Sequence, residues 1–250
     1  MLSVPVLSAL TSEQIIDLWQ RGREASYGER IGLLLSAAFP KAQSEDLLRL
    51  TIGQRDAVLL RLRELTFGGT VSCVAECPDC RALSEHLVEV SELLGGATGE
   101  LGTHETLFDR DGYRIRFRPL SGEDLASIRR RSGPDAVRAL LLDCCIVSVW
   151  DNGVEVSPDE LPAEIVAEFG EVVADSDRHS EIWLDTECSE CGLEFDSVFD
   201  ALDFCWREIA AEARRTVAEL DYLVAAYGWS QAKILKMSRA RRRLYMEASQ

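Results

Sequence analysis

Hydrophobic residues recur at helical spacing through the first part of the chain. Thr11 and Gln14 have the spacing of a capping box, and the apolar residues that directly follow them repeat with the helical period. Glu29–Ala38 and Ile52–Leu65 also carry an apolar helical face, and a pair of glycines follows the second. We therefore expect residues 1–69 to form an N-terminal helical region.

Short stretches that are β-branched, or that alternate polar with apolar residues, predict strands. These stretches are Thr70–Ala75, Leu83–Val90, Leu107–Arg110, Tyr113–Phe117, Glu181–Glu187 and Leu193–Val198. The third and fourth flank Asp111-Gly112, a pair that favours the tight turn of a β-hairpin. The sequence thus predicts several small antiparallel units rather than one large sheet.

Helical periodicity returns between and after the strands. Ser121 is a good N-cap with acidic residues behind it, and Asp135–Trp150 has a strongly apolar face. Leu161–Val173 predicts an acidic amphipathic helix. Two long helices are expected at Leu202–Tyr227 and Gln231–Ala248, separated by Gly-Trp-Ser. We predict an α+β fold that is mainly helical and ends in a C-terminal helical hairpin.

The overall composition indicates a folded, acidic protein. The hydrophobic fraction of 46% is enough to bury a core, and no apolar run reaches the length of a membrane span. The 43 Asp and Glu against 27 Lys and Arg give a net charge of −16, which argues against a general nucleic-acid coat. Its first residues, with no basic region before the apolar ones, make a poor signal peptide. We expect folding in a reducing cytoplasm.

The charge is concentrated in two blocks of opposite sign. Residues 151–200 hold 16 acidic residues and one basic residue, whereas residues 233–250 hold six basic residues and one acidic residue. One interpretation of each block is a solvated surface. The alternative is that the two blocks attract partners of opposite charge, which would suit ordered assembly with other proteins.

The cysteines carry the strongest chemical signal. Cys77 and Cys80 form one CxxC motif, and Cys188 and Cys191 form a second, with a glycine after the second motif only. Each pair lies between strand-like stretches, and two such pairs supply the four thiolates of a tetrahedral structural zinc site. A pair that has lost its metal, or a disulfide in an oxidising setting, is the alternative. We predict that these four cysteines bind one Zn²⁺.

The distance between the two CxxC motifs implies a split zinc ribbon. We expect residues 70–96 and 181–200 to form its halves, residues 97–180 to be an inserted hairpin and helical region, and residues 201–250 to form the C-terminal helices. Long insertions cost little loop entropy if they fold. The alternative is two unrelated domains with separate metal sites.

The remaining reactive residues do not assemble into a catalytic motif. Cys73 precedes Cys77 by four positions and could replace a ligand, and His86 is expected in a strand. Cys144, Cys145 and Cys205 lie on apolar helical faces, as core thiols do. No HExxH, phosphate loop or nucleophile elbow occurs in the sequence, and a four-thiolate zinc has no open position for substrate. We do not expect an enzyme.

A series of short motifs in a fixed order gives a family resemblance. The motifs are Leu50–Asp56, Leu59–Arg63, Phe67-Gly68, Cys77–Cys80, Phe117–Leu125, Cys188–Gly192, Phe199-Asp200, Phe204–Glu208, Tyr227–Ser230, Ile234-Leu235 and Arg241–Tyr245. Their order resembles the T4-type baseplate hub protein family of contractile phage tails and related injection systems, over about residues 27–248. The resemblance implies a structural component of the virion tail baseplate, assembled in the host cytoplasm, with other baseplate and tail proteins as partners.

The basic end of the chain is the expected docking element. Arginine and aromatic side chains are the usual anchors of protein interfaces. We expect an acidic partner surface to contact Trp229, Arg241, Arg242, Arg243 and Tyr245. Alternatively, this helix packs wholly within its own chain. Two other functions remain open at this point, an assembly chaperone absent from the mature particle and a zinc-ribbon nucleic-acid binder.

Overall fold

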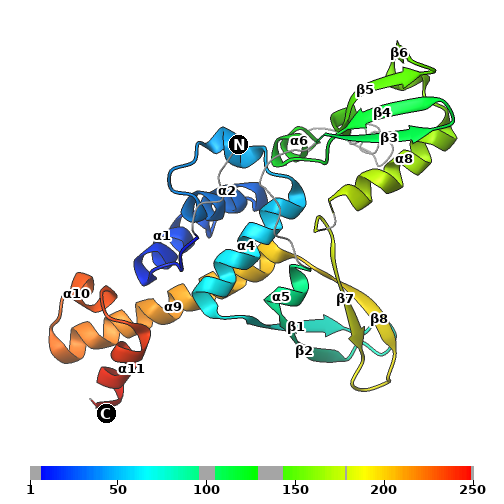
Figure 1. Cartoon of the computed structure of the whole chain (residues 1–250). Coiled ribbons are helices and arrows are strands. Elements are labelled where there is room, and N and C mark those ends of the chain that lie inside the picture. The colour runs from blue at the N-terminus through cyan, green and yellow to red at the C-terminus, as the bar shows by residue number, and fades with distance from the viewer. Residues whose placement is uncertain (1–6, 96–104, 129–142, 178, 249–250) are drawn as a thin grey trace.

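The computed structural model describes residues 7–95, 105–128, 143–177 and 179–248. Figure 1 shows an elongated molecule in three parts. A helical body holds the first and last described helices, two β-hairpins lie beside one end of it, and a small sheet with its own helix forms the third part. Within these residues, no helix is both long and apolar enough to cross a membrane.

The N-terminal helices form one side of the helical body. They are α1 (Ser12–Gly22), α2 (Tyr27–Ala38), α3 (Ser44–Leu48) and α4 (Ile52–Phe67). The predicted Thr11–Gln14 capping box is confirmed, and Ser26 and Thr51 cap the next two long helices in the same way. Because Ser26 is the cap, α2 begins two residues before the predicted Glu29. The short helix α3 was not predicted.

The helix α9 (Ala201–Tyr227) is the central helix of the helical body. Its first half packs against α1, α2 and α4 in one core, to which it contributes Cys205, Ile209 and Ala213. Leu34 and Leu59, from α2 and α4, are almost completely buried there. Burial of each such leucine stabilises the fold by about 1.5–3 kcal/mol. The N-terminal region and the C-terminal helix are therefore one packed unit.

Two hairpins extend from the same end of this body. β1 (Thr70–Glu76) pairs with β2 (Leu83–Glu89), and β7 (Ile182–Glu187) pairs with β8 (Glu194–Phe199), each as a separate two-stranded sheet. They share a second core with Leu60 of α4, and α5 (Val90–Leu93) follows the first hairpin. Segments more than 100 positions apart thus lie side by side (Figure 1).

The third part is a four-stranded antiparallel sheet between the two hairpins in sequence. Its strands, in spatial order, are β3 (Thr106–Arg110), β4 (Tyr113–Phe117), β5 (Ile146–Asp151) and β6 (Val154–Val156). The helix α8 (Ala163–Ser176) covers one face, where Phe169 packs edge-on against Phe117, and the 3₁₀ turn Pro158–Glu160 precedes it. The predicted hairpin at Asp111-Gly112 is confirmed, with both residues at positive φ.

One sequence expectation for this region was wrong. The helix expected over Asp135–Trp150 does not continue through its last residues, because Ile146–Trp150 belong to β5 and pair with β4. Residues 135–142 lie outside the described part of the chain. Ile-Val-Ser-Val-Trp is rich in β-branched residues, which favour strands. Val149 is buried in the core between this sheet and α8. The Asn152-Gly153 turn, which leads into β6, is the signal for a hairpin here.

Two segments of the insert, one after β4 and one after α8, meet the start of α4. Thr51 and Ser121 form an isolated antiparallel bridge just before α6 (Gly122–Ile128). After α8, the carboxylate of Asp177 accepts hydrogen bonds from the Thr51 hydroxyl at 3.2 Å and the Gly53 backbone N–H at 2.8 Å. The Leu50–Asp56 motif is therefore the point at which the insert joins the helical body.

The C-terminal end differs from the single helix expected over Gln231–Ala248. It forms two short helices, α10 (Gln231–Leu235) and α11 (Arg239–Ala248), with a break at residues 236–238. Ser238 caps the second helix by accepting from the Arg241 backbone N–H at 3.3 Å. The break turns α11 back onto the last half of α9, so that a small core forms around Leu223 and Ile234.

Candidate metal centre

The structure brings the four predicted ligand cysteines together at the tips of the two hairpins. One sulfur atom from each of Cys77, Cys80, Cys188 and Cys191 lies within 4.8 Å of the other three. Two of the contacts cross between the hairpins, at 3.7 Å for Cys77–Cys191 and 3.5 Å for Cys80–Cys188. The cluster therefore joins residues that are 108 and 114 positions apart in the chain.

The two CxxC turns have the same backbone geometry. In the first, the Cys77 N–H donates to the Ala82 carbonyl at 2.9 Å, and the Arg81 N–H donates to the Cys77 carbonyl at 3.1 Å. In the second turn, the equivalent bonds run from Cys188 to Leu193 and from Gly192 to Cys188, both at 2.9 Å. Each turn closes its own hairpin and directs both sulfur atoms toward the opposite hairpin.

Arg81 and Gly192 occupy equivalent places after the second cysteine of each motif. Their φ angles are 62° and 70°, so both lie in the left-handed region. Glycine adopts this conformation freely, whereas an L-residue with a Cβ is strained there by roughly 1–2 kcal/mol. The Arg81 guanidinium also bonds Glu76 at 2.9 Å, but both side chains are exposed and such a pair contributes little. The first turn is consequently the more strained of the two.

A pair of serines, which the sequence analysis did not identify, links the hairpins beside the cysteines. The Ser84 and Ser189 hydroxyls are 3.2 Å apart, and the Ser189 backbone N–H donates to Ser84 Oγ at 3.2 Å. Ser84 is buried, with 4% of its surface exposed. The hairpins are therefore held together by direct hydrogen bonds as well as by the cysteine cluster. No spacing rule connects a strand serine to a residue 105 positions away.

The donor set fits a tetrahedral metal ion. With metal–sulfur bonds of about 2.3 Å, a tetrahedral zinc site places its sulfur atoms about 3.8 Å apart, close to the two cross-hairpin distances. The pKa of the Cys188 thiol is lowered to about 6, because the backbone N–H groups of Cys191 and Glu190 donate to its sulfur. Cys188 is therefore the member of the cluster that most readily forms the thiolate that binds metals. The Leu193 N–H favours the Cys191 thiolate as well, but the neighbouring Cys188 and Cys80 thiols outweigh it and raise the pKa of Cys191 to about 12. Four thiolates would fill the coordination shell and leave no position for a substrate.

The other cysteines and His86 lie outside this cluster. Cys73 is opposite His86 in the β1–β2 register, half-buried and pointing toward the second core. Burial raises the pKa of Cys145 to about 12 and also raises the pKa of Cys205, so both thiols stay protonated near neutral pH. The Cys205 thiol donates to the Leu59 carbonyl at 3.6 Å. These residues behave as core thiols, as predicted for Cys145 and Cys205.

The residues predicted for docking are divided between the core and the surface. Arg242 is completely buried and donates to Glu219 on α9 at 2.6 Å, to the Met237 carbonyl and to the Ser12 hydroxyl. Its predicted contact with a partner is therefore wrong, because α11 folds back and gives this side chain partners within the chain. Arg241 and Arg243 are exposed.

The aromatic members of the same predicted set pack against one another. Trp229 stacks on Tyr227 with ring centroids 4.6 Å apart, and Tyr245 meets Trp229 edge-on at 4.8 Å. The Tyr227 hydroxyl donates to the Tyr245 carbonyl at 2.9 Å. Trp229 and Tyr245 are half-buried, so each still has surface that a partner could reach. These rings primarily hold α10 and α11 on α9.

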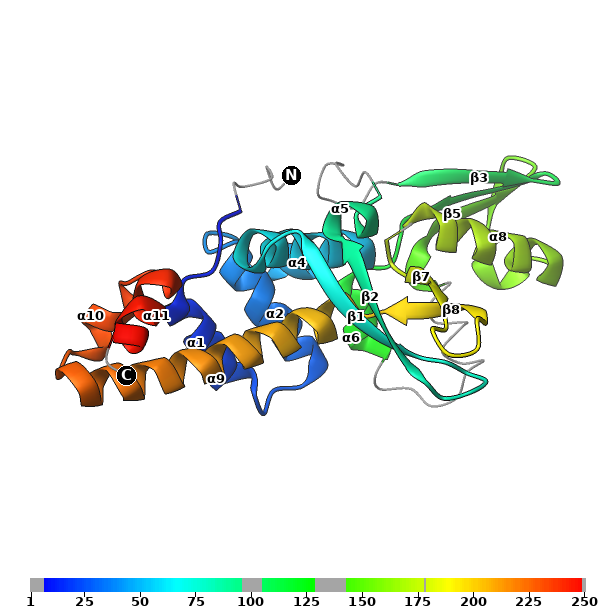
Figure 2. The same ribbon diagram turned by 90° about the horizontal axis from the view of Figure 1, so that it is seen from below.

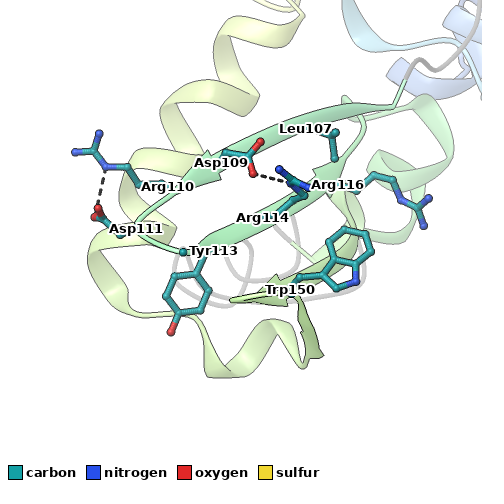
Figure 3. A pocket seen from close by; sticks show the side chains of 10 residues that line it. Leu107, Asp109, Arg110, Asp111, Tyr113, Arg114, Arg116 and Trp150 are labelled. Atoms are coloured by element: carbon teal, nitrogen blue, oxygen red, sulfur yellow. Dashed lines mark hydrogen bonds and ion pairs between the residues drawn. The ribbon is translucent and has the colours of Figure 1, made fainter.

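The outer face of the four-stranded sheet carries a polar hollow, which we consider as a second candidate site. Its hollow of about 860 Å³ is lined by Leu107, Trp150 and several charged residues (Figure 3). Arg114 bonds Asp109 at 2.6 Å, and Arg116 lies over the Trp150 ring while bonding Ser148 at 3.1 Å. No Cys, His or Ser is among the residues that line it. The arrangement offers no nucleophile with an adjacent base.

Comparison with known proteins places the chain in a family. A family model described as the T4 bacteriophage base plate protein matches residues 22–204, well over half of the chain, and this span contains both CxxC motifs. The last three motifs of the resemblance, from Tyr227 onward, lie beyond the matched residues. Neither the curated proteins nor the solved structures compared with the chain include a match. The chain belongs to the family of the T4 bacteriophage base plate protein.

Proposed function

We propose that this chain is a permanent structural subunit of the baseplate hub in a contractile phage tail or a phage-derived injection system. The observation that carries the proposal is the match of residues 22–204 to the base plate family, together with a closed cluster of four cysteines. The family indicates a structural role in the tail baseplate, and a filled thiolate shell serves architecture rather than catalysis. We assign no catalytic step to the chain.

We propose that the metal is Zn²⁺, held by Cys77, Cys80, Cys188 and Cys191. When bound, the ion would supply four metal–thiolate bonds between two hairpins that are otherwise joined by a few hydrogen bonds. The insert, with its sheet and α8, lies in sequence between these hairpins. Fixing the hairpins to each other therefore also fixes both ends of the insert. A subunit that transmits force or position within a baseplate needs this rigidity.

We also propose that the C-terminal unit, residues 229–248, docks an acidic surface of a neighbouring subunit. Arg241 and Arg243 are exposed, and guanidinium groups bind carboxylates in a defined, often bidentate geometry. Leu244 is 63% exposed beside them and can add apolar contact. The buried Arg242–Glu219 pair anchors α11 and so presents the neighbouring arginines in a fixed position.

Particle composition tests the proposed function. Intact particles are purified and the copy number of the chain is measured by quantitative mass spectrometry against known tail proteins. A fixed whole-number ratio supports a permanent subunit that resides in the virion tail after assembly in the host cytoplasm. Absence from particles that nevertheless require the chain for assembly would identify an assembly chaperone and overturn the proposal.

A DNA-binding measurement separates the remaining alternative, a zinc-ribbon nucleic-acid binder. The support for that function is the basic C-terminal unit, whose Arg242 is already neutralised by Glu219. Electrostatic binding to a phosphate backbone requires several free cations. We expect no retention of the purified chain on duplex or single-stranded DNA at about 150 mM salt, whereas specific binding would favour the alternative.

A further inference from the structure

The outer face of the β7–β8 hairpin carries paired like charges. In the hairpin register, Asp185 is directly opposite Asp196 and Glu187 is directly opposite Glu194, and all four side chains are exposed. We call these four residues the carboxylate ladder. Like charges directly across a strand pair destabilise a sheet. None of the ion pairs found among the described residues includes any of the four, so the repulsion is not relieved within this part of the chain.

Two large apolar side chains continue the same face. Trp183 and Val198 are opposite each other in the register and are 54% and 61% exposed. A tryptophan with a β-branched neighbour, next to charged residues, has the composition of an interface anchor with a polar rim. The ladder borders a shallow hollow of about 500 Å³. The face therefore suits a partner that has cations beside an apolar side chain.

The C-terminal unit has the complementary arrangement. Arg241 and Arg243 lie three positions and one position before Leu244 on α11, and Lys236 is exposed in the break before that helix. Leu244 is 63% exposed. Because Arg242 is locked onto Glu219, the helix holds this surface rigidly against α9. It thus offers two guanidinium groups beside one apolar side chain.

The two complementary surfaces cannot meet within one molecule. In both views, α10 and α11 lie at one end of the long helix α9, and the β7–β8 hairpin lies beyond the other end (Figures 1 and 2). Any contact between them must therefore join two molecules. The arginines on the four-stranded sheet are less suitable partners for the carboxylate ladder than those of the C-terminal unit, because Arg114 and Arg116 already bond Asp109 and Ser148.

We propose that the β7–β8 face is the docking site for the C-terminal unit of a second copy of this chain. Arg241 and Arg243 of one copy would bond the carboxylate ladder of the next, and Leu244 would pack against Trp183 and Val198. This inference rests on the proposed function, because it names the acidic partner of the C-terminal unit. Such a contact is heterologous, so repeated copies form a ring if the rotation closes and an open chain if it does not.

Two charge-reversal variants of the full-length chain test the proposal. The ladder variant is Asp185→Lys with Asp196→Lys, and the C-terminal variant is Arg241→Glu with Arg243→Glu, all at exposed positions. Mass is measured by sedimentation velocity and light scattering at rising protein concentration. Wild type should exceed the 27.8 kDa of one chain, whereas each variant alone should associate at least about tenfold more weakly.

The mixture of the two variants gives the sharpest result. The ladder variant keeps an intact C-terminal unit and the C-terminal variant keeps an intact ladder, and the two reversed surfaces also have opposite charges. An equimolar mixture should therefore regain the association of wild type, with the two variants alternating. A chain that carries both sets of changes should regain self-association with the charges exchanged. The control Glu164→Lys with Glu171→Lys alters the net charge of the acidic block equally on α8 and should associate like wild type.

Several outcomes would overturn the inference. It is wrong if wild type stays at the mass of one chain at about 100 μM, the upper range for weak assembly contacts, or if the ladder variant associates as wild type does. If wild type is monomeric but the C-terminal variant is excluded from particles, the proposed docking role stands with a different protein as partner. If wild type self-associates through this contact but both variants enter particles normally, the docking role in the baseplate fails instead.

Discussion

The Asp177 carboxylate accepts a hydrogen bond from the backbone N–H of Gly53 at 2.8 Å, across 124 positions of the chain. A β-carbon added at Gly53 would lie 2.2 Å from that carboxylate and 3.0 Å from the backbone of His179. The position thus accommodates only glycine without a shift in the neighbouring chain. This contact fixes the end of the insert to the first turn of α4.

Substitution of Gly53 should therefore loosen the insert. We expect Gly53→Ala to destabilise the protein by about 1–3 kcal/mol, the usual cost of overpacking. Urea unfolding followed by circular dichroism measures the loss. Gly32→Ala is the matched control, because its β-carbon would meet nothing within 4 Å and alanine favours the helix by about 0.5–1 kcal/mol. Equal effects of the two substitutions would contradict the role of Gly53.

Metal removal tests the cysteine cluster. We expect one zinc per chain in freshly purified protein, measured by inductively coupled plasma mass spectrometry. Cys188→Ser, or a strong chelator, should lower Tm by at least about 10 °C, because structural zinc contributes folding energy and 1 kcal/mol shifts Tm by roughly 2–4 °C at this size. Cys205→Ser should leave the zinc content unchanged, since its thiol bonds Leu59 far from the cluster. Protein that is folded, metal-free and fully thiol-reactive would exclude the site.

Arg81 and Gly192 each follow the second cysteine of a CxxC motif, and substitutions at these two positions should change the stability of the protein in opposite directions. Arg81→Gly relieves a positive φ of 62° and should stabilise the protein by about 1 kcal/mol. Gly192→Arg imposes the same strain on the second turn and should destabilise it by about 1–2 kcal/mol. Thermal unfolding of the zinc-loaded protein measures both. A stability loss in Arg81→Gly would mean that the exposed Arg81–Glu76 pair matters more than the backbone strain.

The Arg118–Asp124 pair predicts a pH dependence of stability. Burial of Asp124 acts to raise its pKa, but the Arg118 guanidinium at 2.6 Å and the donors of Ser121 outweigh it, so the pKa lies below the ordinary 3.8. Because the folded pKa is below the unfolded one, this contribution is complete above about pH 4 and disappears as the pH falls through the folded pKa. Arg118 is 27% exposed, so water screens the pair.

Asp124→Asn checks this assignment. We expect a loss of about 1–2 kcal/mol at pH 7, after allowance for solvent screening of the charged hydrogen bonds. The variant should lose less further stability than wild type between about pH 4 and pH 2, because it has no carboxylate to protonate. Parallel acid-unfolding curves for the two proteins would show that Asp124 does not contribute to acid sensitivity.

The buried Arg242–Glu219 pair should be essential for the C-terminal unit. Arg242→Ala leaves the buried Glu219 with only its longer contact to Arg215, at 3.7 Å, and loss of one member of a buried pair costs roughly 3–5 kcal/mol. Hydrogen exchange should show early opening of α10 and α11. Arg243→Ala, at an exposed position on the same helix, is the control and should change stability by less than about 0.5 kcal/mol. Charge-reversal experiments on this helix should consequently leave Arg242 unchanged.

Local chemistry made part of the structure predictable. The capping box at Thr11 and the Asp111-Gly112 hairpin depend on residues within a few positions of each other, and both formed as expected. The four cysteines of the cluster were predicted to act together from the spacing within each pair, which is also local. The expectation that the two pairs lie together, across more than 100 residues, followed from the four ligands that a tetrahedral metal site requires.

The errors arose where tertiary contacts decided between local alternatives. Ile146–Trp150 is apolar enough for a helix, but pairing with β4 and packing on Phe169 make it a strand. The charge of Arg242 suggested exposure, yet Glu219, 23 positions earlier on α9, removes it from solvent. The Ser84–Ser189 link is likewise visible only once the hairpins are placed together. Each of these depends on a partner that no local pattern specifies.

The separation of the two CxxC motifs also sets an order of events during translation. Cys188 leaves the ribosome 108 residues after Cys80, which takes roughly 5–20 s at ordinary rates of synthesis. During that interval the first hairpin presents only two of the four thiols, too few to complete a tetrahedral shell. The intervening sheet and α8 can pack in the meantime, because their core is their own. Metal binding would then be a late step, which joins the two hairpins after the sheet and α8 between them have already folded.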